Sequence, residues 1–482
     1  MIYYNVVNKK DFVGRKNEFV RLKAFAQLQH AAILVVYGRR RIGKTELLEQ
    51  SFADREILKF EGLERQAQAD QINQVLYQAA QYFEQAYIAK LNFTTWVEVL
   101  DFIADQLPQT EVTLYFEELQ WLANYEDVFI SALKFVWDNK LRHNPKLRVV
   151  LCGSSPSFMI NQVLHSKALY NRSLYEMHLQ PLNLAEIRLF LPKLSLHEVI
   201  LACLTLGGIP EYLQYIRESP SVFLGICANS FVKDSMFSRE YERIFISSLN
   251  KNPHYQKIIH YLSLRRFATR DQIVKHLGIK SGGSVTLLLK DLEQCGFIER
   301  YKPYYLTSGR GLYRYCMRDQ YLMFYYKFID PIQQNILLGQ YDSNPEQAIN
   351  QQSYHIWMGY AFERLIRYNQ HLIAKILGFS GLTYEWGVFY SRETTAENPG
   401  YQIDLLFKHS KHVYTICEIK YYSDLVGPEV IGAMEEKLAL FSNEKNLTIK
   451  KVLITTFGVT KKLKERAYFD RIITVEDLFR LN

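Results

Sequence analysis

The sequence predicts an α/β protein with a parallel sheet near its N-terminus and a second α/β unit near its C-terminus. Continuous apolar runs at 31–37, 112–116 and 148–153 are typical of parallel strands that are buried on both faces. Amphipathic stretches separate these runs, as expected when helices cover both sides of such a sheet. With 482 residues, the chain also exceeds the roughly 250–300 residues at which a single core stops growing, so we expect several domains.

Changes in composition along the chain place the domain boundaries. Residues 184–250 have a mostly helical pattern that is interrupted at GGIP (207–210), and a polar stretch at 339–353 is the best candidate for a linker. The predicted segments are 1–180 (α/β core), 181–253 (helical lid), 254–310 (helix-turn-helix unit), 311–354 (connector) and 355–482 (second α/β unit).

Bulk composition indicates a globular protein of a reducing compartment. Apolar residues make up 48% of the chain and charged residues 22%. No apolar run approaches the roughly 20 residues that span a bilayer, and the first residues lack the apolar segment of a secretion signal. The six cysteines contain no CxxC pair, which argues against a disulfide framework and a zinc knuckle. We therefore expect a cytoplasmic protein without membrane contact.

A glycine-rich stretch follows the first apolar run. The sequence VVYGRRRIGKTELL fits the pattern G-x-x-x-x-G-K-[ST], in which glycines let backbone N–H groups turn toward a phosphate and the next helix adds its positive end. Lys44 would reach the β- and γ-phosphates, and the Thr45 hydroxyl would bind Mg²⁺. The pattern predicts a P-loop NTPase that binds ATP and Mg²⁺ through Gly38, Arg39, Arg40, Arg41, Ile42, Gly43, Lys44 and Thr45.

Two acids end the second apolar run, in VTLYFEELQWL. Glu117 stands at the position expected to hold the metal, where an aspartate is usual, and Glu118 is the better candidate for orienting the attacking water. The alternative is that both are exposed acids that open a helix.

Other polar residues are weaker candidates for the same site. Ser154 and Ser155 follow the third run, where they could sense the γ-phosphate or simply form an ordinary turn. Arg172 could stabilise charge during catalysis, from its own chain or from a neighbouring subunit, or it could be a solvated arginine.

The middle of the chain carries most of the surplus positive charge. Residues 254–310 contain ten Lys or Arg and four acids, whereas the whole chain has a net charge of +8. The pattern of 269–306 predicts a winged helix-turn-helix, with a first helix near 270–277, a second helix from Ser284 and a wing in FIERYKPYYL. The second helix would bury one face of apolar residues, and four Lys or Arg side chains of the unit would face the solvent. This apolar stripe is Val285, Leu288, Leu289, Leu292 and Cys295, and the cations are Lys280, Lys290, Arg300 and Lys302. Such a unit contacts DNA phosphates or acts as an interdomain connector with solvated charges.

The order of the motifs resembles the prokaryotic archaeal-type ATPases, which are AAA-related P-loop proteins close to the signal-transducing (STAND) NTPases. The resemblance rests on DFVGRKNEFVRL (11–22), the phosphate loop, FEELQWL, LCGSS, LQPLNLAEIRLFLP (179–192) and GGIPEYL (207–213). It implies that Gly14 and Arg15, and Gly208 and Pro210 of a helical lid, lie near the nucleotide base. The glutamate at position 117 departs from the family pattern.

Near the C-terminus, QIDLLFKHSKHVYTICEIKYY predicts two strands that each carry an acid. Alternation puts Gln402, Asp404 and Leu406 on one face of the first strand, opposite Ile403, Leu405 and Phe407. On the second strand Ile416, Glu418 and Lys420 share a face. If the strands pair, Asp404 meets Glu418, and a divalent metal would offset their repulsion while Lys420 stabilises charge on a phosphate.

This arrangement resembles the PD-(D/E)XK nuclease superfamily, especially its resolvase-like branch. The resemblance implies a restriction-endonuclease-like fold for the C-terminal domain, with Glu363 on a preceding helix completing a site of Asp404, Glu418 and Lys420. The alternative is a degenerate nuclease fold, or a structural salt bridge between Lys420 and one of the acids.

Together these patterns predict an ATPase whose nucleotide state controls a DNA-directed module that ends in a nuclease-like domain, with metal-dependent DNA cleavage as one outcome. The alternative is a nucleotide-dependent switch or scaffold that binds DNA or protein and whose C-terminal fold no longer cleaves. A small-molecule kinase is a weaker reading, because nothing else resembles an acceptor site. Expected partners are ATP, DNA, and a second copy of the chain or another protein.

Overall fold

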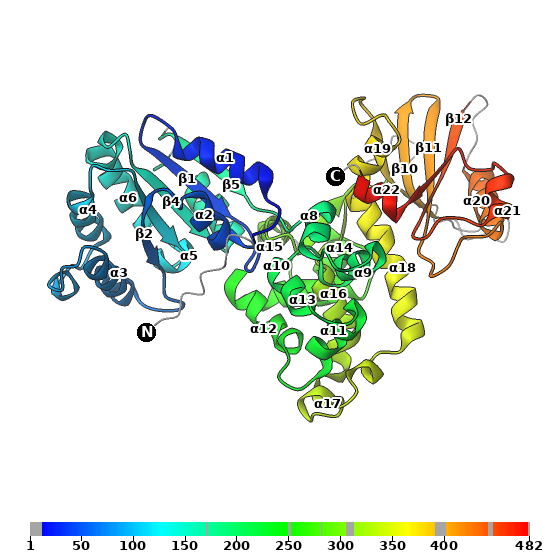
Figure 1. The fold of residues 1–482 in the computed structure, drawn as a ribbon, viewed down its shortest axis with the longest axis horizontal. Helices are drawn as coiled ribbons and strands as arrows, with labels where there is room; N and C mark the ends of the chain where they lie inside the picture. Colours follow the sequence, from blue (N-terminus) through cyan, green and yellow to red (C-terminus); the bar gives the residue numbers. More distant parts are fainter. Residues whose placement is uncertain are drawn as a thin grey trace.

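The structure is a computed structural model and describes residues 12–169, 172–248, 252–280, 282–304, 313–390, 402–441 and 447–480. Two α/β units lie at opposite ends of the molecule, and a mostly helical region lies between them (Figure 1). In the described residues, no helix has the length and apolar character needed to cross a membrane.

The N-terminal unit is built on a five-stranded parallel sheet with the order β2-β3-β4-β1-β5. Its strands are β1 (Ala32–Tyr37), β2 (Glu56–Glu61), β3 (Val112–Glu117), β4 (Arg148–Gly153) and β5 (Leu174–His178). The three apolar runs become the three central strands, as predicted. The two edge strands were not predicted, because β2 is buried only at alternate positions and β5 is buried only at Met177, so neither forms a continuous apolar run.

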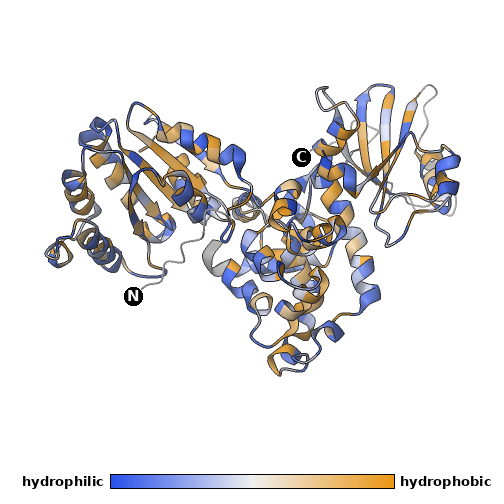
Figure 2. Ribbon diagram, in the orientation of Figure 1, coloured by the Kyte–Doolittle hydropathy of each residue, from blue (hydrophilic) through white to orange (hydrophobic). Residues whose placement is uncertain are grey.

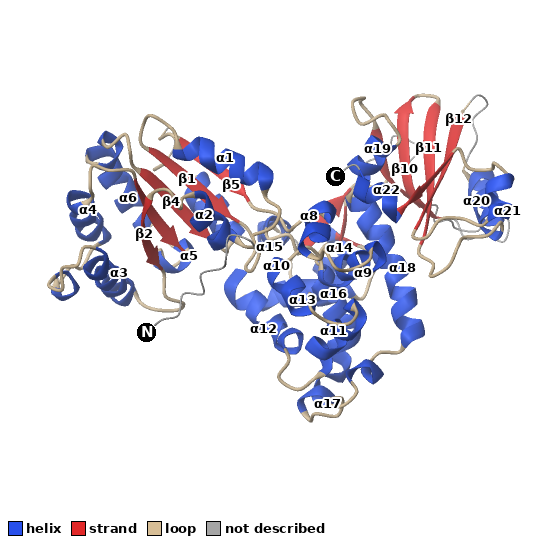
Figure 3. Ribbon diagram, in the orientation of Figure 1, coloured by secondary structure: helices blue, strands red, loops and turns tan. Residues whose placement is uncertain are grey.

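Helices cover both faces of this sheet (Figure 3). They are α1 (Lys16–Ala26), α2 (Lys44–Ser51), α3 (Gln68–Tyr82), α4 (Trp96–Gln106), α5 (Leu119–Leu122), α6 (Val128–Asn139) and α7 (Pro156–Phe158). Ile33 and Val35 pack with α3, α4 and α6, whereas Leu34 and Val36 pack with α1 and α2. Burial on both faces explains why these strands are apolar throughout (Figure 2).

The middle region begins with a helical segment, as predicted for 184–250 apart from residues 249 and 250, which lie outside the described residues. Its helices are α8 (Leu184–Phe190), α9 (Leu196–Leu206), α10 (Pro210–Ile216), α11 (Val222–Phe231) and α12 (Met236–Ser248). The GGIP sequence separates α9 from α10, and Pro210 is the first residue of α10.

A compact unit of three helices and a three-stranded antiparallel sheet follows, with the strand order β6-β8-β7. Its elements are α13 (Pro253–Ser263), β6 (Ala268–Thr269), α14 (Arg270–Leu277), α15 (Gly283–Gln294), β7 (Ile298–Tyr301) and β8 (Arg314–Met317). The predicted apolar stripe of the second helix is buried from Val285 to Cys295. The outer part of the predicted wing, at 305–312, lies outside the described residues.

The connector is short and packed. It contains α16 (Gln320–Phe324), α17 (Gln333–Leu337) and the 3₁₀ turn Pro345–Ala348. This turn lies in the predicted linker at 339–353 and contacts α11, so part of that stretch packs against the helical region.

The C-terminal unit is built on a mixed sheet with the order β13-β12-β11-β10-β9. Strands β9, β10 and β11 pair antiparallel, and β11, β12 and β13 pair parallel. The elements are α18 (Gln351–Tyr368), α19 (Gln370–Ile376), β9 (Glu385–Tyr390), β10 (Gln402–Ser410), β11 (Val413–Lys420), α20 (Glu429–Leu440), β12 (Thr448–Thr455), α21 (Lys461–Glu465), β13 (Arg471–Thr474) and α22 (Val475–Arg480).

Strand β10 departs from the predicted alternation at Ile403. Leu405 packs with the core on the α18 side, whereas Ile403 lies on the opposite side together with Leu406. The pairing of β10 with β9 shifts register between Ile403 and Leu406, and such an irregularity re-aims the side chains around it. The prediction that Ile403 shares a face with Leu405 is therefore wrong, and Asp404 lies within the irregularity.

A buried arginine closes the amino end of the N-terminal sheet. Arg148 is 1% exposed, and its guanidinium donates to five backbone carbonyls, those of Phe25, Leu28, His30, Pro145 and Leu147. Burial, followed by repulsion from Arg55, lowers the pKa of Arg148 to about 10.

We predict that Arg148→Met destabilises the N-terminal unit by roughly 2–4 kcal/mol, because five backbone carbonyls lose a buried donor. Thermal unfolding followed by circular dichroism measures the effect. Arg142→Met, at an exposed arginine nearby, is the matched control and should leave the Tm unchanged. Equal Tm values for the two variants would contradict the prediction.

Candidate functional site

The loop between β1 and α2 has the backbone shape of a phosphate cradle. Gly38 has a φ of 156°, and a Cβ there would lie 2.4 Å from the carbonyl oxygen of Leu179. Gly43 has a φ of 82° and immediately precedes α2. The ammonium of Lys44 donates to the carbonyls of Gly38 at 3.2 Å and Arg39 at 3.0 Å, which holds it inside the loop.

Thr45 and Glu117 meet beside this loop. The Thr45 hydroxyl donates to the Glu117 carboxylate, and Lys59 of β2 forms an ion pair with the same carboxylate at 2.5 Å. Burial lowers the pKa of Lys59, but Glu117 and Glu49 outweigh this effect and raise it above its ordinary value. A hydroxyl and a carboxylate are oxygen donors of the kind that Mg²⁺ prefers.

Glu118 lies at the carboxyl end of the same sheet. Its carboxylate accepts hydrogen bonds from the Ser154 hydroxyl at 2.6 Å and the Gln120 amide at 2.7 Å. Ser154 is fully buried at the end of β4, and Ser155 is also buried. The acid and the serines predicted for this edge therefore lie together.

Arg15 joins the phosphate loop to the segment after β5. It is 3% exposed and donates to the carbonyls of Gln180 at 2.7 Å and Ile42 at 3.0 Å. Gly208 meets the same segment, because a Cβ at this position would lie 2.0 Å from the carbonyl oxygen of Leu182.

These elements surround a cavity of about 980 Å³. Ten of the predicted residues line it: Arg15, Arg40, Arg41, Ile42, Gly43, Lys44, Thr45, Glu117, Glu118 and Pro210. Gly14 precedes Arg15, and a Cβ on it would lie 3.0 Å from the Glu186 carboxylate, outside the lining. Gly38 and Gly208 shape the backbone around the cavity.

Two of the three loop arginines are held by acids. The Arg39 side chain forms an ion pair with Asp319, which precedes α16, and lines a second cavity instead of the first. Arg41 lines the first cavity and forms ion pairs with Glu211 and, at 2.8 Å, with Glu240. The Arg39 side chain thus points away from the first cavity, and the predicted part of Arg39 in the nucleotide site, through the loop backbone, stays a prediction.

Arg172 lies at the other end of the sheet. It directly precedes the edge strand β5 and forms an ion pair with Asp138 at 2.9 Å. Ile33, near the start of β1, is paired with Leu174, so Arg172 lies at the amino end of the strands and the phosphate loop at the carboxyl end. A role for Arg172 in the site of its own chain is therefore wrong on this geometry, and a role from a neighbouring subunit stays a prediction.

The C-terminal acids also lie together. Asp404 and Glu418, 9% and 1% exposed, lie at opposing positions of β10 and β11. Lys437 of α20 lies 2.5 Å from Glu418 and 3.8 Å from Asp404, and Lys420 lies 2.8 Å from Glu418. Among the described residues, no three acid, histidine or cysteine side chains converge in a metal-binding geometry.

Glu363 of α18 lies close enough to this cluster for its charge to interact with that of Asp404. Burial, followed by the negative charge of Asp404, raises the pKa of Glu363 to about 7. Burial also raises the pKa of Asp404, although Lys437 opposes the change. Glu418 raises the pKa of Lys420 even though burial lowers it.

Several site residues were not predicted from the sequence. They are Lys59, Gln120, Arg217 and Lys437. Arg217 directly follows α10 and brings a lid cation into the first cavity, only four residues beyond the GGIPEYL motif. Lys59 contacts Glu117 from the neighbouring strand β2, and Lys437 contacts Asp404 and Glu418 from helix α20, so no local pattern in the sequence marks them.

Residues 12–216 match the family model described as an ATPase domain predominantly from Archaea. The chain is an ATP-hydrolysing enzyme. Over these residues the chain is similar to P-loop ATPases of the archaeal type, the family that the order of its motifs resembles.

Relatives and similar structures extend beyond this domain. An uncharacterized protein of Methanocaldococcus jannaschii is 26% identical over 359 residues, which cover 74% of this chain and 76% of that protein. A Walker-type ATPase of Pyrococcus abyssi has a TM-score of 0.47 and 16% identity, over 66% of this chain and 97% of that chain. The ORC2 protein of Aeropyrum pernix has a TM-score of 0.42 and 11% identity, over 69% of this chain and 96% of that chain.

We predict that Glu118→Gln slows ATP turnover by about 10²–10⁴-fold and leaves nucleotide binding intact, because a neutral amide cannot accept a proton from water. Single-turnover hydrolysis and binding of a fluorescent ATP analogue measure the two effects separately. Lys44→Ala is the matched control and should weaken binding itself. Turnover at the unaltered rate in Glu118→Gln would contradict the role of this acid.

Proposed function

We propose that the protein is an ATPase whose nucleotide site controls a DNA-directed module ending in a nuclease-like domain. The observation that carries this proposal is the contact between the phosphate loop and the middle of the chain, where Arg39 pairs with Asp319. The domain assignment is 1–180 for the ATPase core, 181–253 for the lid, 254–310 for a winged helix, 311–354 for a connector and 355–482 for the nuclease-like domain.

In the nucleotide site, different residues of the chain bind the phosphates, orient the water and would bind the metal. Lys44 and the loop backbone bind the phosphates, and Glu118 orients the attacking water, with Ser154 and Gln120 fixing its carboxylate. Thr45 and Glu117 would hold Mg²⁺, which would neutralise charge on the phosphates. Arg217 would add a positive charge from the lid.

Charge and exposure support a DNA-binding role for the winged helix. Lys275, Lys280, Lys290 and Lys302 are exposed on this unit. One part of α15 is tied to the ATPase core, because Ser157 donates to Asp291 at 2.5 Å. The exposed side of α15 carries Thr286, Leu287 and Lys290.

The placement of the C-terminal acids supports a nuclease-like site. Asp404 and Glu418 lie on two neighbouring strands, Lys420 lies beside Glu418, and Glu363 approaches from the preceding helix. Two carboxylates this close provide oxygen ligands for a divalent metal.

One observation favours a second candidate function, a nucleotide-dependent switch whose C-terminal fold does not cleave. Lys437 and Lys420 already provide two positive charges for the two acids. In this arrangement the acids need no metal to offset their repulsion.

We predict that a double variant, Lys280→Ala and Lys290→Ala, weakens duplex DNA binding. The slope of log Kd against log salt should fall by about one for each phosphate that a lysine no longer neutralises. Fluorescence anisotropy over a range of salt concentrations measures the slope. Arg142→Ala, on the ATPase unit, is the control. A slope unchanged in the double variant would contradict DNA binding by these lysines.

We predict that the full chain with Mn²⁺ cuts linear, branched or single-stranded DNA, and that Asp404→Asn and Glu418→Gln abolish cutting because each removes a metal ligand. Gel analysis of labelled DNA measures the products, and Lys44→Ala reports whether cutting depends on ATP. Intact DNA with all three substrates would exclude the nuclease and leave the switch as the function.

A further inference from the structure

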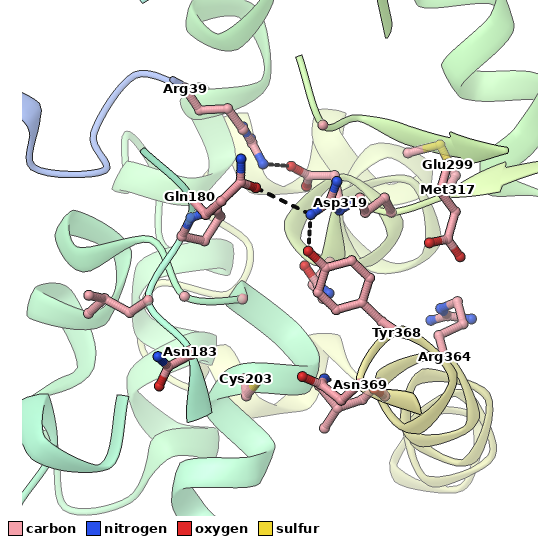
Figure 4. A pocket seen from close by; sticks show the side chains of 18 of the residues that line it. Arg39, Gln180, Asn183, Cys203, Glu299, Met317, Asp319, Arg364, Tyr368 and Asn369 are labelled. Atoms are coloured by element: carbon pink, nitrogen blue, oxygen red, sulfur yellow. Dashed lines mark hydrogen bonds and ion pairs between the residues drawn. The ribbon is translucent and has the colours of Figure 1, made fainter. Parts of the chain in front are cut away.

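A second cavity, of about 230 Å³, lies where six parts of the chain meet. Its lining comes from Arg39 of the phosphate loop, the segment after β5, the lid, the unit of α13–β8, residues 318–320 and the end of helix α18. Figure 4 shows Asn183 and Cys203 on one side of the hollow and Glu299 and Arg364 on the other. The volume is far larger than the roughly 10–15 Å³ that one water molecule needs, so a small organic molecule fits.

Arg364 lines this cavity without a hydrogen-bond partner. Its Nε and Nη2 atoms are buried, and no described residue accepts a hydrogen bond from either atom. Burial, followed by repulsion from Arg367, lowers the pKa of Arg364 to about 10. A half-buried guanidinium whose buried Nε–H and Nη2–H groups have no acceptor is unfavourable, and an anion at this place would satisfy them.

The two acids in the lining are already bound to other arginines. Glu299 forms an ion pair with Arg367 at 3.1 Å, and Asp319 forms one with Arg39. Figure 4 shows the contact between Arg39 and Asp319 as a dashed line at the edge of the hollow. Among the described residues neither acid forms an ion pair with Arg364, although the negative charges of Glu363 and Glu299 partly oppose the lowering of its pKa.

A second guanidinium in the lining, that of Arg318, also has no acid partner among the described residues. It donates to the Gln180 amide oxygen at 3.4 Å and to the Tyr368 hydroxyl, and it stacks on the Tyr368 ring at 4.4 Å. These neutral contacts orient the group and leave its charge uncompensated. The cavity thus contains two arginines that form no ion pair with a described residue.

The remaining lining suits an anion that carries an organic body. Asn183 and Asn369 provide amide groups, whereas Leu179, Leu182 and Leu365 provide apolar surface. Leu182 also lines the nucleotide cavity, so the two sites share a wall.

We propose that this cavity binds a small phosphorylated molecule whose phosphoryl group pairs with Arg364 and Arg318. A phosphate monoester carries a charge of about −1.5 to −2 near pH 7, which matches two guanidinium groups better than a single carboxylate does. Its oxygens also accept the paired hydrogen bonds that a planar guanidinium offers.

Binding can be measured by calorimetry on the full chain with the phosphate loop filled by saturating ADP and Mg²⁺. The probes are inorganic phosphate, phenyl phosphate and benzoate at equal ionic strength. Tighter binding of phenyl phosphate assigns a monoester, and binding of inorganic phosphate alone assigns the free ion. Benzoate is expected not to bind, because its single charge cannot satisfy both arginines.

Arg364→Met should raise the Kd of the bound probe at least tenfold. It should leave the Tm of the ligand-free protein unchanged or higher, because it removes a guanidinium whose buried Nε–H and Nη2–H groups have no acceptor. Arg318→Gln provides a second variant with the same expected loss, and Arg142→Met is the control with unchanged binding. Absence of binding by both phosphates, equal binding of benzoate, or undiminished binding by both cavity variants would overturn the proposal.

Discussion

The ion pair between Arg39 and Asp319 connects the phosphate loop to the rest of the chain. Arg39 lies between Gly38 and Lys44 in the loop, and its guanidinium also lies 4.9 Å from the Phe297 ring in the turn after α15. Asp319 has a second task, because its carboxylate accepts a hydrogen bond from the Leu322 N–H at the start of α16 at 2.6 Å. Burial lowers the pKa of Arg39, but the negative charge of Asp319 outweighs it, so the pair remains charged. A buried pair of this kind contributes more to fixing a unique arrangement than to net stability.

The packing around this pair is continuous across the predicted domains. One core cluster runs from a face of the ATPase sheet through the lid and α13–α15 to α18 and strands β10 and β11. Helix α9 contacts α16, α18 and α22, so a lid helix touches both the connector and the last helix of the chain. A displacement of the lid would therefore act directly on α18. This helix carries Glu363, which belongs to the C-terminal acid cluster, and Arg364, which lines the second cavity. Close-packed interiors have low compressibility and transmit strain, so a movement of the lid would displace the helices packed against it.

Local sequence patterns predicted those features that depend on interactions between residues close together in the sequence. The phosphate loop, the three central strands and the buried stripe of α15 each depend on residues close together in sequence, and all three are present. The edge strands β2 and β5 were missed because a half-exposed strand has no continuous apolar run. The irregularity at Asp404 is set by the pairing of β10 with β9, so an alternation rule applied to one strand misplaces Ile403. The acids that pair with Arg39, Lys59 and Lys437 lie on other segments of the chain. The charge of a lysine or arginine does not show which acid it will pair with, so these ion pairs could not be predicted.

The acid cluster of the C-terminal sheet contains a lysine, Lys437, that the sequence did not indicate and that bears on whether the cluster could bind a metal. Asp404 and Glu418 lie together in a buried site, where burial and then the negative charge of Glu418 raise the pKa of Asp404 against the opposing charge of Lys437. Lys420 is fixed on β11 beside Glu418, as a residue that acts on a phosphate must be. Lys437 is different, because it comes from α20 and approaches both carboxylates, the position that a divalent cation would take. A metal would have to displace Lys437 while Lys420 stays in place. For the proposed function, the choice between cleavage and a purely regulatory role would therefore be a competition between one ammonium group and one metal ion for the same pair of carboxylates.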